Sequence, residues 1–203
     1  FLTMTAFVIS RKDFKYRNVI SFYFYFTTLF NGGMVCTYIF YIQYYGLKDN
    51  LLALILPGLT PVFYMLIMRN FVSGIPSALI ESAKIDGAGE VRIFFQIVLP
   101  LLGSGLATIG LFMALTYWND WYNAMLYINT EWKYPLQYML YNMIQKAAAM
   151  ARVASQLGIP VENMPTNTLK LAMAVVATGP IILLYPFVQK DFVKGVTIGS
   201  VKG

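Results

Sequence analysis

Long stretches without a charged residue make up most of this chain, and short segments that carry its lysines and arginines separate them. The stretches lie at residues 1–10, 18–47, 50–68, 93–119 and 171–189. A helix that spans a bilayer needs about 20 mostly apolar residues. The last four stretches are therefore long enough to span, and the first matches the end of a further span. This pattern predicts an all-α fold, a polytopic membrane helical bundle with about five spans.

Glycine, proline and asparagine interrupt three of these stretches. Proline and glycine break the helical hydrogen-bond ladder, and membrane helices tolerate this where neighbouring helices or water satisfy the freed carbonyl groups. Such breaks suit a bundle that moves during transport, although glycine and proline are also generally more frequent in membrane helices. The predicted breaks are Asn31-Gly32-Gly33 in the second stretch, Pro57 and Pro61 in the third, and Gly179-Pro180 with Pro186 in the last.

The positive charges indicate how the spans are oriented. If the spans alternate in direction, ten lysines and arginines fall on one side and five on the other. The positive-inside rule places the richer side in the cytoplasm. That side carries Arg11, Lys12, Lys15, Arg17, Arg69, Lys84, Arg92, Lys190, Lys194 and Lys202, and the other carries Lys48, Lys133, Lys146, Arg152 and Lys170.

This orientation divides the polar segments between the two sides of the membrane. Residues 10–18 and 70–99 are predicted to contain the cytoplasmic segments, and residues 189–203 form a cytoplasmic tail. A short turn at 46–50 and a long extracytoplasmic excursion at 120–168 are predicted on the outside.

The composition agrees with a membrane protein and excludes several functional classes. Hydrophobic residues make up 58% of the chain and charged residues only 12%, whereas soluble chains carry about 25% charged residues. With no histidine and one cysteine, Cys36, the chain offers no Ser-His or Cys-His nucleophile and no histidine metal site. The net charge of +6 does not predict nucleic-acid binding, because the positive residues separate apolar stretches instead of forming one basic face.

The segment at 75–92 has the pattern of a short helix followed by a sharp turn. Pro76 suits the first turn of a helix, and residues 77–85 contain helix formers for about two turns. Gly87 and Gly89 then stop the helix. On this helix the small and apolar residues share one face while the polar ones stay available to a partner. The apolar face is Ile75, Ala78, Leu79, Ser82 and Ala83, and the polar residues are Glu81, Lys84 and Asp86.

Six positions over residues 81–100 carry a resemblance to a known family. They are Glu81 and Ala83 of Glu81-Ser82-Ala83, then Gly87, Ile97 and Leu99-Pro100. Their spacing resembles the EAA loop of binding-protein-dependent ABC importer permeases, with Ser82 in place of the middle alanine. An ordinary amphipathic interfacial loop is the alternative interpretation.

The resemblance implies that residues 75–92 form the coupling helix and loop, which in that family lies in a cleft of the ATP-hydrolysing subunit. Glu81 would then make polar contacts with the ATPase, Ser82 and Ala83 would allow close approach, and Gly87 would turn the chain. Lys84 and Asp86 belong to the same candidate set. The chain itself lacks a Walker loop, so no catalytic residue, metal site or cofactor is expected in it, and ATP and Mg²⁺ belong to the partner ATPase.

Further motifs resemble the carbohydrate branch of this family, in particular the smaller permease subunit of the maltose importer. This implies a type I ABC importer transmembrane domain in a bacterial cytoplasmic membrane, with about five of six spans present and the N-terminal helix absent. It also implies a second permease subunit, two ATPase subunits and an extracytoplasmic solute-binding protein as partners, with a sugar as substrate. The motifs are Ser10-Arg11-Lys12-Asp13-Phe14, Ala83-Lys84-Ile85-Asp86-Gly87-Ala88, Trp118-Asn119-Asp120-Trp121 and the ending 189–203.

An aromatic and polar cluster at the outer boundary of a span is the candidate sugar path. Indole faces pack on the C–H faces of sugar rings, and asparagine and aspartate bond to hydroxyl groups. An aromatic belt at the headgroup level is the competing interpretation, and Asp120 favours the functional one because a carboxylate beside a span usually faces protein or water. Asn31 is a weaker candidate, for which a satisfied interhelical amide is the alternative. The cluster is Trp118, Asn119, Asp120, Trp121, Tyr122 and Asn123.

The outer excursion contains a helix-like stretch at 136–157. Leu136, Leu140, Met143, Ile144, Ala147 and Met150 form an apolar stripe, which predicts an external helix. By resemblance the excursion would meet the solute-binding protein. It is longer than in the maltose-type subunit, which favours larger oligosaccharides, including those from plant or algal polysaccharides.

Two other functional classes compete with a sugar importer. An ABC permease for a non-sugar solute is the main alternative. An ion-coupled carrier is less favoured, because such carriers show ionisable residues deep in their spans and the uncharged stretches offer none. A membrane serine protease at Gly103-Ser104-Gly105 is excluded by the absence of histidine.

Overall fold

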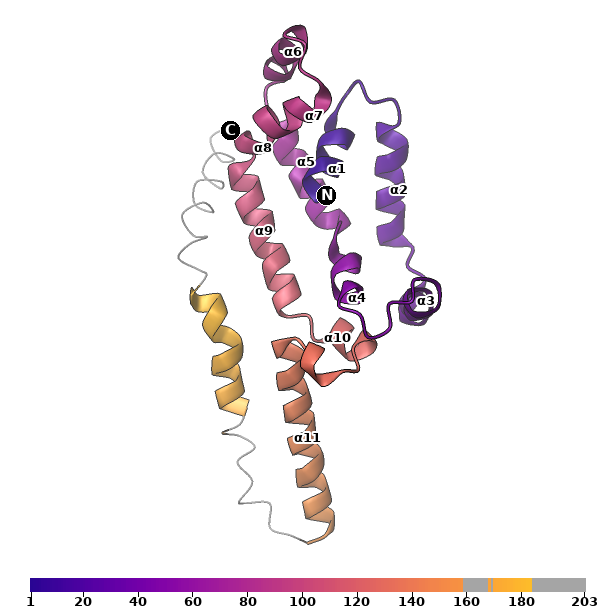
Figure 1. Cartoon of the computed structure of the whole chain (residues 1–203), viewed down its shortest axis with the longest axis vertical. Helices are drawn as coiled ribbons and strands as arrows, with labels where there is room; N and C mark the ends of the chain where they lie inside the picture. The colour runs from indigo at the N-terminus through magenta and orange to yellow at the C-terminus, as the bar shows by residue number, and fades with distance from the viewer. Residues whose placement is uncertain (159–167, 169, 184–203) are drawn as a thin grey trace. The chain divides into compact units, whose positions relative to one another are not determined.

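The computed structural model describes residues 1–158, 168 and 170–183, and this part of the chain consists of helices and connections without a strand (Figure 1). The predicted all-α fold class is confirmed there. The chain divides into two compact units. The described residues of the first unit are Phe1–Thr37 and Ile55–Met113, and those of the second are Tyr38–Leu54 and the described part of Ala114–Phe187.

The first unit contains most of the amino-terminal half of the chain. Its helices are α1 (Leu2–Ser10), α2 (Arg17–Leu29), the 3-10 turn η2 (Leu56–Gly58), α5 (Val62–Ser73), α6 (Ser77–Ile85), α7 (Glu90–Ile93), the π-helical turn η3 (Phe94–Val98), α8 (Leu99–Leu101) and the start of α9 (Gly103–Trp118). The helix α3 (Gly33–Ile39) lies at its boundary.

The second unit contains the region predicted to form the outer excursion. Its elements are the π-helical turn η1 (Phe40–Tyr44), α4 (Leu52–Ile55), the end of α9, α10 (Tyr122–Tyr127), the 3-10 turn η4 (Glu131–Lys133), α11 (Leu136–Gln156) and a helix at Lys170–Leu183. The helix predicted at 136–157 is confirmed by α11. Of its predicted stripe, Leu140 is buried, whereas Met143 and Met150 are exposed.

The core of the first unit forms where α1 packs along α5. Both helices direct residues three and four positions apart towards this core, as amphipathic helices do. The segment from α7 to α9 contributes further buried residues to this core. The buried cluster is Leu2, Ala6, Phe7, Ile9, Met65, Met68, Val72, Ala83, Ile93, Phe94, Val98, Leu102 and Ile109.

Helix α2 carries a long aromatic run and buries none of its side chains within this chain. Phe22, Tyr23, Tyr25 and Leu29 are all more than half exposed. A large exposed apolar surface is typical of contact with lipid or with another protein, which agrees with the membrane bundle predicted from the sequence.

Three of the five uncharged stretches fold as bent helix pairs. Among the described residues, no single helix is both long and apolar enough to cross a bilayer, but three pairs satisfy the length and composition criteria together. The pairs are Arg17–Leu29 with Gly33–Tyr44, bent by 114°, Leu52–Gly58 with Val62–Ser73, bent by 48°, and Glu90–Leu101 with Gly103–Trp118, bent by 81°. The first two bends lie at the predicted breaks Asn31-Gly32-Gly33 and Pro57 to Pro61.

Helical segments run through two of the prolines in the uncharged stretches. Pro100 lies inside the helical segment Glu90–Leu101, and the bend follows it at Leu102. The predicted break at Gly179-Pro180 is absent, because the helix continues to Leu183. Membrane helices tolerate such prolines where other groups satisfy the freed carbonyl. Pro180 leaves the carbonyl of Val176 without its helical donor, and the indole N–H of Trp118 donates to the next carbonyl, that of Ala177, at 3.0 Å. Pro186 and the predicted tail at 189–203 lie outside the described residues.

Gly105 allows α9 to approach the Phe71 ring of α5 closely. A Cβ at this position would lie 2.9 Å from Phe71 Cγ, which is fixed close to the backbone and moves little with side-chain rotation. We expect Gly105→Ala to lower the free energy of unfolding by about 1–3 kcal/mol, the usual cost of overpacking. Thermal unfolding of the purified protein in detergent would measure this.

Gly110→Ala is the matched control for this experiment. Gly110 lies on the same helix, and a Cβ there meets no atom within 4 Å, so the midpoint of unfolding should stay level or rise slightly. Equal midpoints for the two variants would show that the Phe71 contact does not constrain α9.

Candidate functional site

The candidate coupling segment forms a helix with the predicted bounds. Helix α6 runs from Ser77 to Ile85. Pro76 is its N-cap, one position before the predicted place in the first turn. Proline fits there because it has no backbone N–H group that would need a partner, and its fixed φ suits the extended conformation before the helix.

The carboxyl end of α6 is a Schellman motif centred on Gly87. Asp86 is the C-cap, the N–H of Gly87 donates to the carbonyl of Lys84 at 3.0 Å, and the N–H of Ala88 donates to the carbonyl of Ala83 at 2.9 Å. Gly87 has a φ of 80°, a left-handed conformation that glycine adopts without steric cost. The predicted turn at Gly87 is therefore confirmed, whereas Gly89 has a φ of −70° and is the N-cap of α7.

Most of the α6 surface is free of contacts with the rest of the first unit. All of its side chains except Ile80 and Ala83 are exposed, including Glu81 and Ser82. Ile85 is 86% exposed, which the sequence pattern did not single out. Ala83 was predicted on the face offered to a partner, but it is 9% exposed and packs into the core of its own unit. It belongs to the same buried cluster as Ile93 and Phe94, the first residue of η3.

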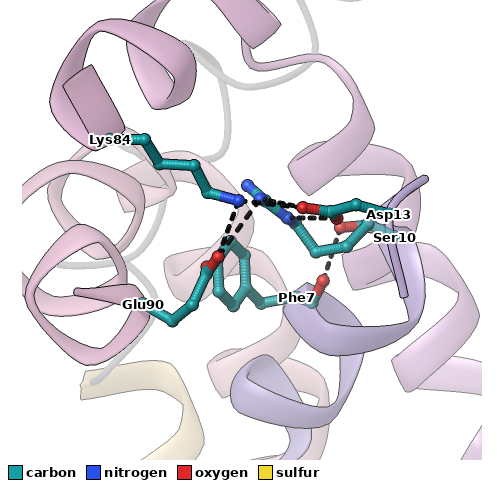
Figure 2. Close-up of polar contacts among 6 residues, drawn as sticks. Phe7, Ser10, Asp13, Lys84 and Glu90 are labelled. Atoms are coloured by element: carbon teal, nitrogen blue, oxygen red, sulfur yellow. Dashed lines mark hydrogen bonds and ion pairs between the residues drawn. The ribbon is translucent and has the colours of Figure 1, made fainter. Parts of the chain in front are cut away.

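Lys84 was predicted to stay available to a partner, but it belongs to a network of four charges within the first unit (Figure 2). Its Nζ lies 2.8 Å from Asp13 Oδ2 and 2.9 Å from Glu90 Oε1. Arg11 Nη2 contacts the same two carboxylates, at 2.8 Å and 3.3 Å. We call Arg11, Asp13, Lys84 and Glu90 the four-charge ring, since each cation contacts both anions.

The four-charge ring contacts aromatic side chains of the core through Arg11. The Arg11 guanidinium lies 5.7 Å from the centre of the Phe7 ring, and Phe7 packs on Phe94 with ring centres 5.5 Å apart. Hydrogen bonds from Arg11 and then Lys84 hold the pKa of Asp13 well below its usual value. The same contacts with Asp13 raise the pKa values of Arg11 and Lys84, so all of these groups are charged at neutral pH.

A groove of about 760 Å³ lies beside the ring, between the end of α1 and the segment that joins α5 to α6. Its lining is mixed, with charged side chains from the ring and apolar ones from Val72, Ile75 and Ile80. The residues along it are Ser10, Arg11, Lys12, Asp13, Val72, Ser73, Gly74, Ile75, Pro76, Ser77, Ile80, Glu81 and Lys84.

The candidate sugar path lies in the second unit, where α9 joins α10. Its polar groups form hydrogen bonds with each other and with backbone carbonyls outside the cluster. Asp120 accepts hydrogen bonds from the backbone N–H of Asn123 at 3.0 Å and from its Nδ2 at 2.9 Å, Asn119 donates to the carbonyl of Leu115, and Trp118 donates to Ala177. These contacts build the joint between the two helices.

The aromatic side chains of this cluster are partly open. The Trp121 ring stacks on Tyr141 of α11 with centres 4.2 Å apart, and Tyr122 packs edge-on against Trp121. One face of Trp121 is therefore covered, and Tyr122 is exposed. Asn31 belongs to the first unit, where its Oδ1 accepts the N–H of Gly33 at 2.8 Å; this local bond at an exposed turn differs from the interhelical amide considered above.

Asp49 organises a second polar cluster that the sequence analysis missed. Its carboxylate accepts hydrogen bonds from the N–H groups of Asn129 and Thr130, from the Thr130 hydroxyl at 2.6 Å and from Lys133 Nζ at 2.8 Å. These bonds, with Lys133 first, hold the pKa of Asp49 well below its usual value. Asp49 has a φ of 54°, which aspartate tolerates better than most residues.

Neither the four-charge ring nor the Asp49 cluster has a clear signature in the local sequence. Arg11 and Asp13 stand in the motif 10–14, but the contact between Lys84 and Asp13 joins residues 71 positions apart. The turn signals at 46–50 marked a connection and gave no partner for Asp49. Trp132, which is 79% exposed beside Lys133, also carries no periodic signal.

Comparison with known proteins gives consistent matches over most of the chain. Residues 3–198 match the family described as "Binding-protein-dependent transport system inner membrane component". The chain is 44% identical over 201 residues to the polygalacturonan/rhamnogalacturonan transport system permease protein YtcP of Bacillus subtilis, which covers 99% of this chain and 70% of the relative. It is 28% identical over 209 residues to the arabinooligosaccharides transport system permease protein AraQ of Halalkalibacterium halodurans, covering 100% and 67%.

A solved structure also matches. The fold is similar to a chain in the crystal structure of a bacterial ABC transporter involved in the import of the acidic polysaccharide alginate, with a TM-score of 0.77 and 30% identity. The match covers 94% of this chain and 67% of the other.

Proposed function

This chain belongs to the family of binding-protein-dependent transport system inner membrane components, and from that premise we propose that it is one of two permease subunits of an ATP-driven importer for oligosaccharides. Family membership confirms the predicted membrane location and the function class of a transport permease. The relatives are transport permeases named for oligosaccharides and polysaccharides, which supports a sugar substrate over another solute.

The observation that carries the coupling role is the shape of α6. It is an exposed two-turn helix, ended sharply by Gly87, in the region predicted to be cytoplasmic. A helix with this much free surface suits insertion into a cleft of an ATPase subunit. In this proposal Glu81, Ser82 and Asp86 face the ATPase, Ala83 and Lys84 hold α6 to its own chain, and two ATPase subunits bind ATP and Mg²⁺.

The complex further includes a second permease subunit and an extracytoplasmic solute-binding protein. ATP binding closes the ATPase subunits and moves α6 with their clefts. The permease helices then rock from inward-facing to outward-facing while the loaded binding protein is docked, and hydrolysis resets them. Alternating access of this kind needs bistable helix packing, and the bent helix pairs offer joints for it.

For the substrate we propose oligosaccharides that contain uronic acids. The names of two matches, one for polygalacturonan and rhamnogalacturonan and one for alginate, share this chemistry, whereas arabinooligosaccharides are neutral. Within this chain the exposed Tyr122 and the half-buried Trp121 are the aromatic groups that we propose stack on sugar rings. Asp120 holds the joint between α9 and α10 and orients them.

Uptake into proteoliposomes tests this function. The full complex, reconstituted with its binding protein and ATP, is expected to import labelled oligogalacturonides at least about tenfold faster than neutral arabinooligosaccharides, a discrimination of about 1.4 kcal/mol between the two substrates. Equal rates would overturn the acidic substrate class. Uptake that follows an ion gradient and ignores ATP would identify an ion-coupled carrier instead, and uptake of a non-sugar ligand of the binding protein would identify the other ABC alternative.

A further inference from the structure

Helix α6 is attached to its unit by very few side chains. Ala83 is its only buried residue and Ile80 its only half-buried one, and alanine buries little surface. The main chain on either side consists of the short connection at 74–76 and the turn at Gly87. Hydrophobic packing alone therefore leaves α6 able to pivot about these two points.

The four-charge ring supplies the remaining attachment. It joins three elements, since Arg11 and Asp13 follow α1, Lys84 lies in the last turn of α6 and Glu90 begins α7. Two positive and two negative groups balance, and each has both opposite charges within 3.3 Å. The Asp13 side chain is 57% exposed, and exposed pairs add little to stability. A closed ring of four charges does, however, fix the distances between the elements that carry them.

We propose that the four-charge ring makes α6, the connection at 11–16 and the start of α7 one rigid body, so that displacement of α6 is delivered directly to α1 and α2. This inference rests on the proposed function, in which the ATPase moves α6. Arg11, Asp13 and Glu90 are positioning residues in this scheme: they contact neither ATP nor sugar and act by tying α6 to the membrane helices.

The packing below the ring shows where the displacement goes. Arg11 is only 14% exposed and lies on Phe7, which packs on Phe94 in the core. Movement of Lys84 therefore pulls on its partner Asp13, and through Asp13 on Arg11 at the end of α1, which packs along α5. Without the ring the same movement would be absorbed by the pivot at Gly87 and at 74–76.

Distance measurements between spin labels test the rigid body directly. Labels at Tyr16→Cys, beyond the ring on the α2 side, and Ser77→Cys, at the far end of α6, would be placed in an otherwise cysteine-free complex. We expect the same distance distribution in the nucleotide-free and ATP-trapped states, and a state-dependent change once Asp13→Asn and Lys84→Met are introduced. A change with the ring intact, or no change with the ring broken, would each overturn the inference.

A double-mutant cycle on coupling tests its consequence. Asp13→Asn and Lys84→Met are each expected to lower the sugar imported per ATP hydrolysed by about fivefold, and the double variant should be no worse, because residues that act through one contact are not additive. Lys12→Gln, which removes a positive charge from the same connection but no ion pair seen in the described residues, should match the wild type. A double variant reduced about 25-fold would show that Lys84 and Asp13 act independently and would overturn the inference.

The two experiments separate this inference from the proposed function. The spin-label distances need ATP but no sugar, so they decide whether the ring is rigid even if no tested sugar is imported. A wild-type complex that imports none of the tested sugars would instead overturn the proposed substrate class.

Discussion

Gly87→Pro is expected to abolish transport while the protein still inserts into the membrane. Proline fixes φ near −65°, whereas Gly87 has a φ of 80°, and its N–H group donates to the carbonyl of Lys84. The substitution makes the left-handed conformation inaccessible and removes the hydrogen bond, at a cost of about 3 kcal/mol or more. It therefore displaces the last turn of α6, which carries Lys84. Sugar uptake by the reconstituted complex should fall to background, and ATP hydrolysis should no longer respond to the loaded binding protein.

Two alanine variants provide the controls. Gly87→Ala keeps the N–H group and carries only the steric cost of a left-handed residue, about 1–2 kcal/mol, so uptake should be reduced and not lost. Gly89→Ala should behave as wild type, because its φ is −70° and an added Cβ meets nothing within 4 Å. Normal uptake by Gly87→Pro would show that α6 does not couple ATP hydrolysis to transport.

Asp49→Ala is expected to weaken the attachment of the turn between η1 and α4 to the segment at 129–133. The substitution leaves the N–H groups of Asn129 and Thr130 without their acceptor and Lys133 without its carboxylate partner. It also places a residue with little tolerance for positive φ at 54°. The midpoint of thermal unfolding should fall by several degrees, and trypsin should cleave after Lys133 faster than in the wild type.

Further variants separate the contributions of charge and backbone. Asp49→Gly removes the carboxylate without the backbone strain and should destabilise less than Asp49→Ala. Glu131→Gln removes one negative charge from the same region. Glu131 is exposed and its ion pair with Lys146 is long, at 3.8 Å, so this variant should change the stability little. Destabilisation by Glu131→Gln equal to that of Asp49→Ala would assign the effect to net charge and contradict the role of the hydrogen bonds.

The stabilising effect of Asp49 has a defined pH range. Its pKa is lower in the folded protein than the usual value of about 3.9, so the stabilisation is fully present above that value and is lost as the pH falls below it. The difference in midpoint between wild type and Asp49→Gly should stay constant from neutral pH down to about pH 5 and shrink below about pH 4. A difference that already shrinks between pH 7 and pH 6 would contradict this assignment.

Local chemistry made several features predictable. Helix α6 was predicted at its observed bounds because its start and end depend on Pro76 and Gly87, residues within a few positions of the helix. The bends near Asn31 and between Pro57 and Pro61 follow for the same reason. The family could be identified because six spaced positions around Glu81 and Gly87 combine with uncharged stretches of membrane-spanning length.

The orientation of side chains could not be obtained in this way. Ala83 and Ser82 are neighbours of similar size in the sequence, yet one packs inward and the other is exposed. Helical periodicity defines which residues share a face but does not define which face meets the core. The predicted break at Gly179-Pro180 was also wrong, since the helix continues through these residues.

By itself, the sequence determined the helical class, the bounds of α6, two of the three bends and the family, because each depends on residues close together in the chain or on composition. Only the tertiary structure showed that Lys84 belongs to the four-charge ring and that Asp49 holds Lys133. These contacts join residues 71 and 84 positions apart. The four-charge ring forms because packing brings α1, α6 and α7 together, and the Asp49 contact forms because packing brings its turn close to η4. A short-range sequence pattern does not contain this information.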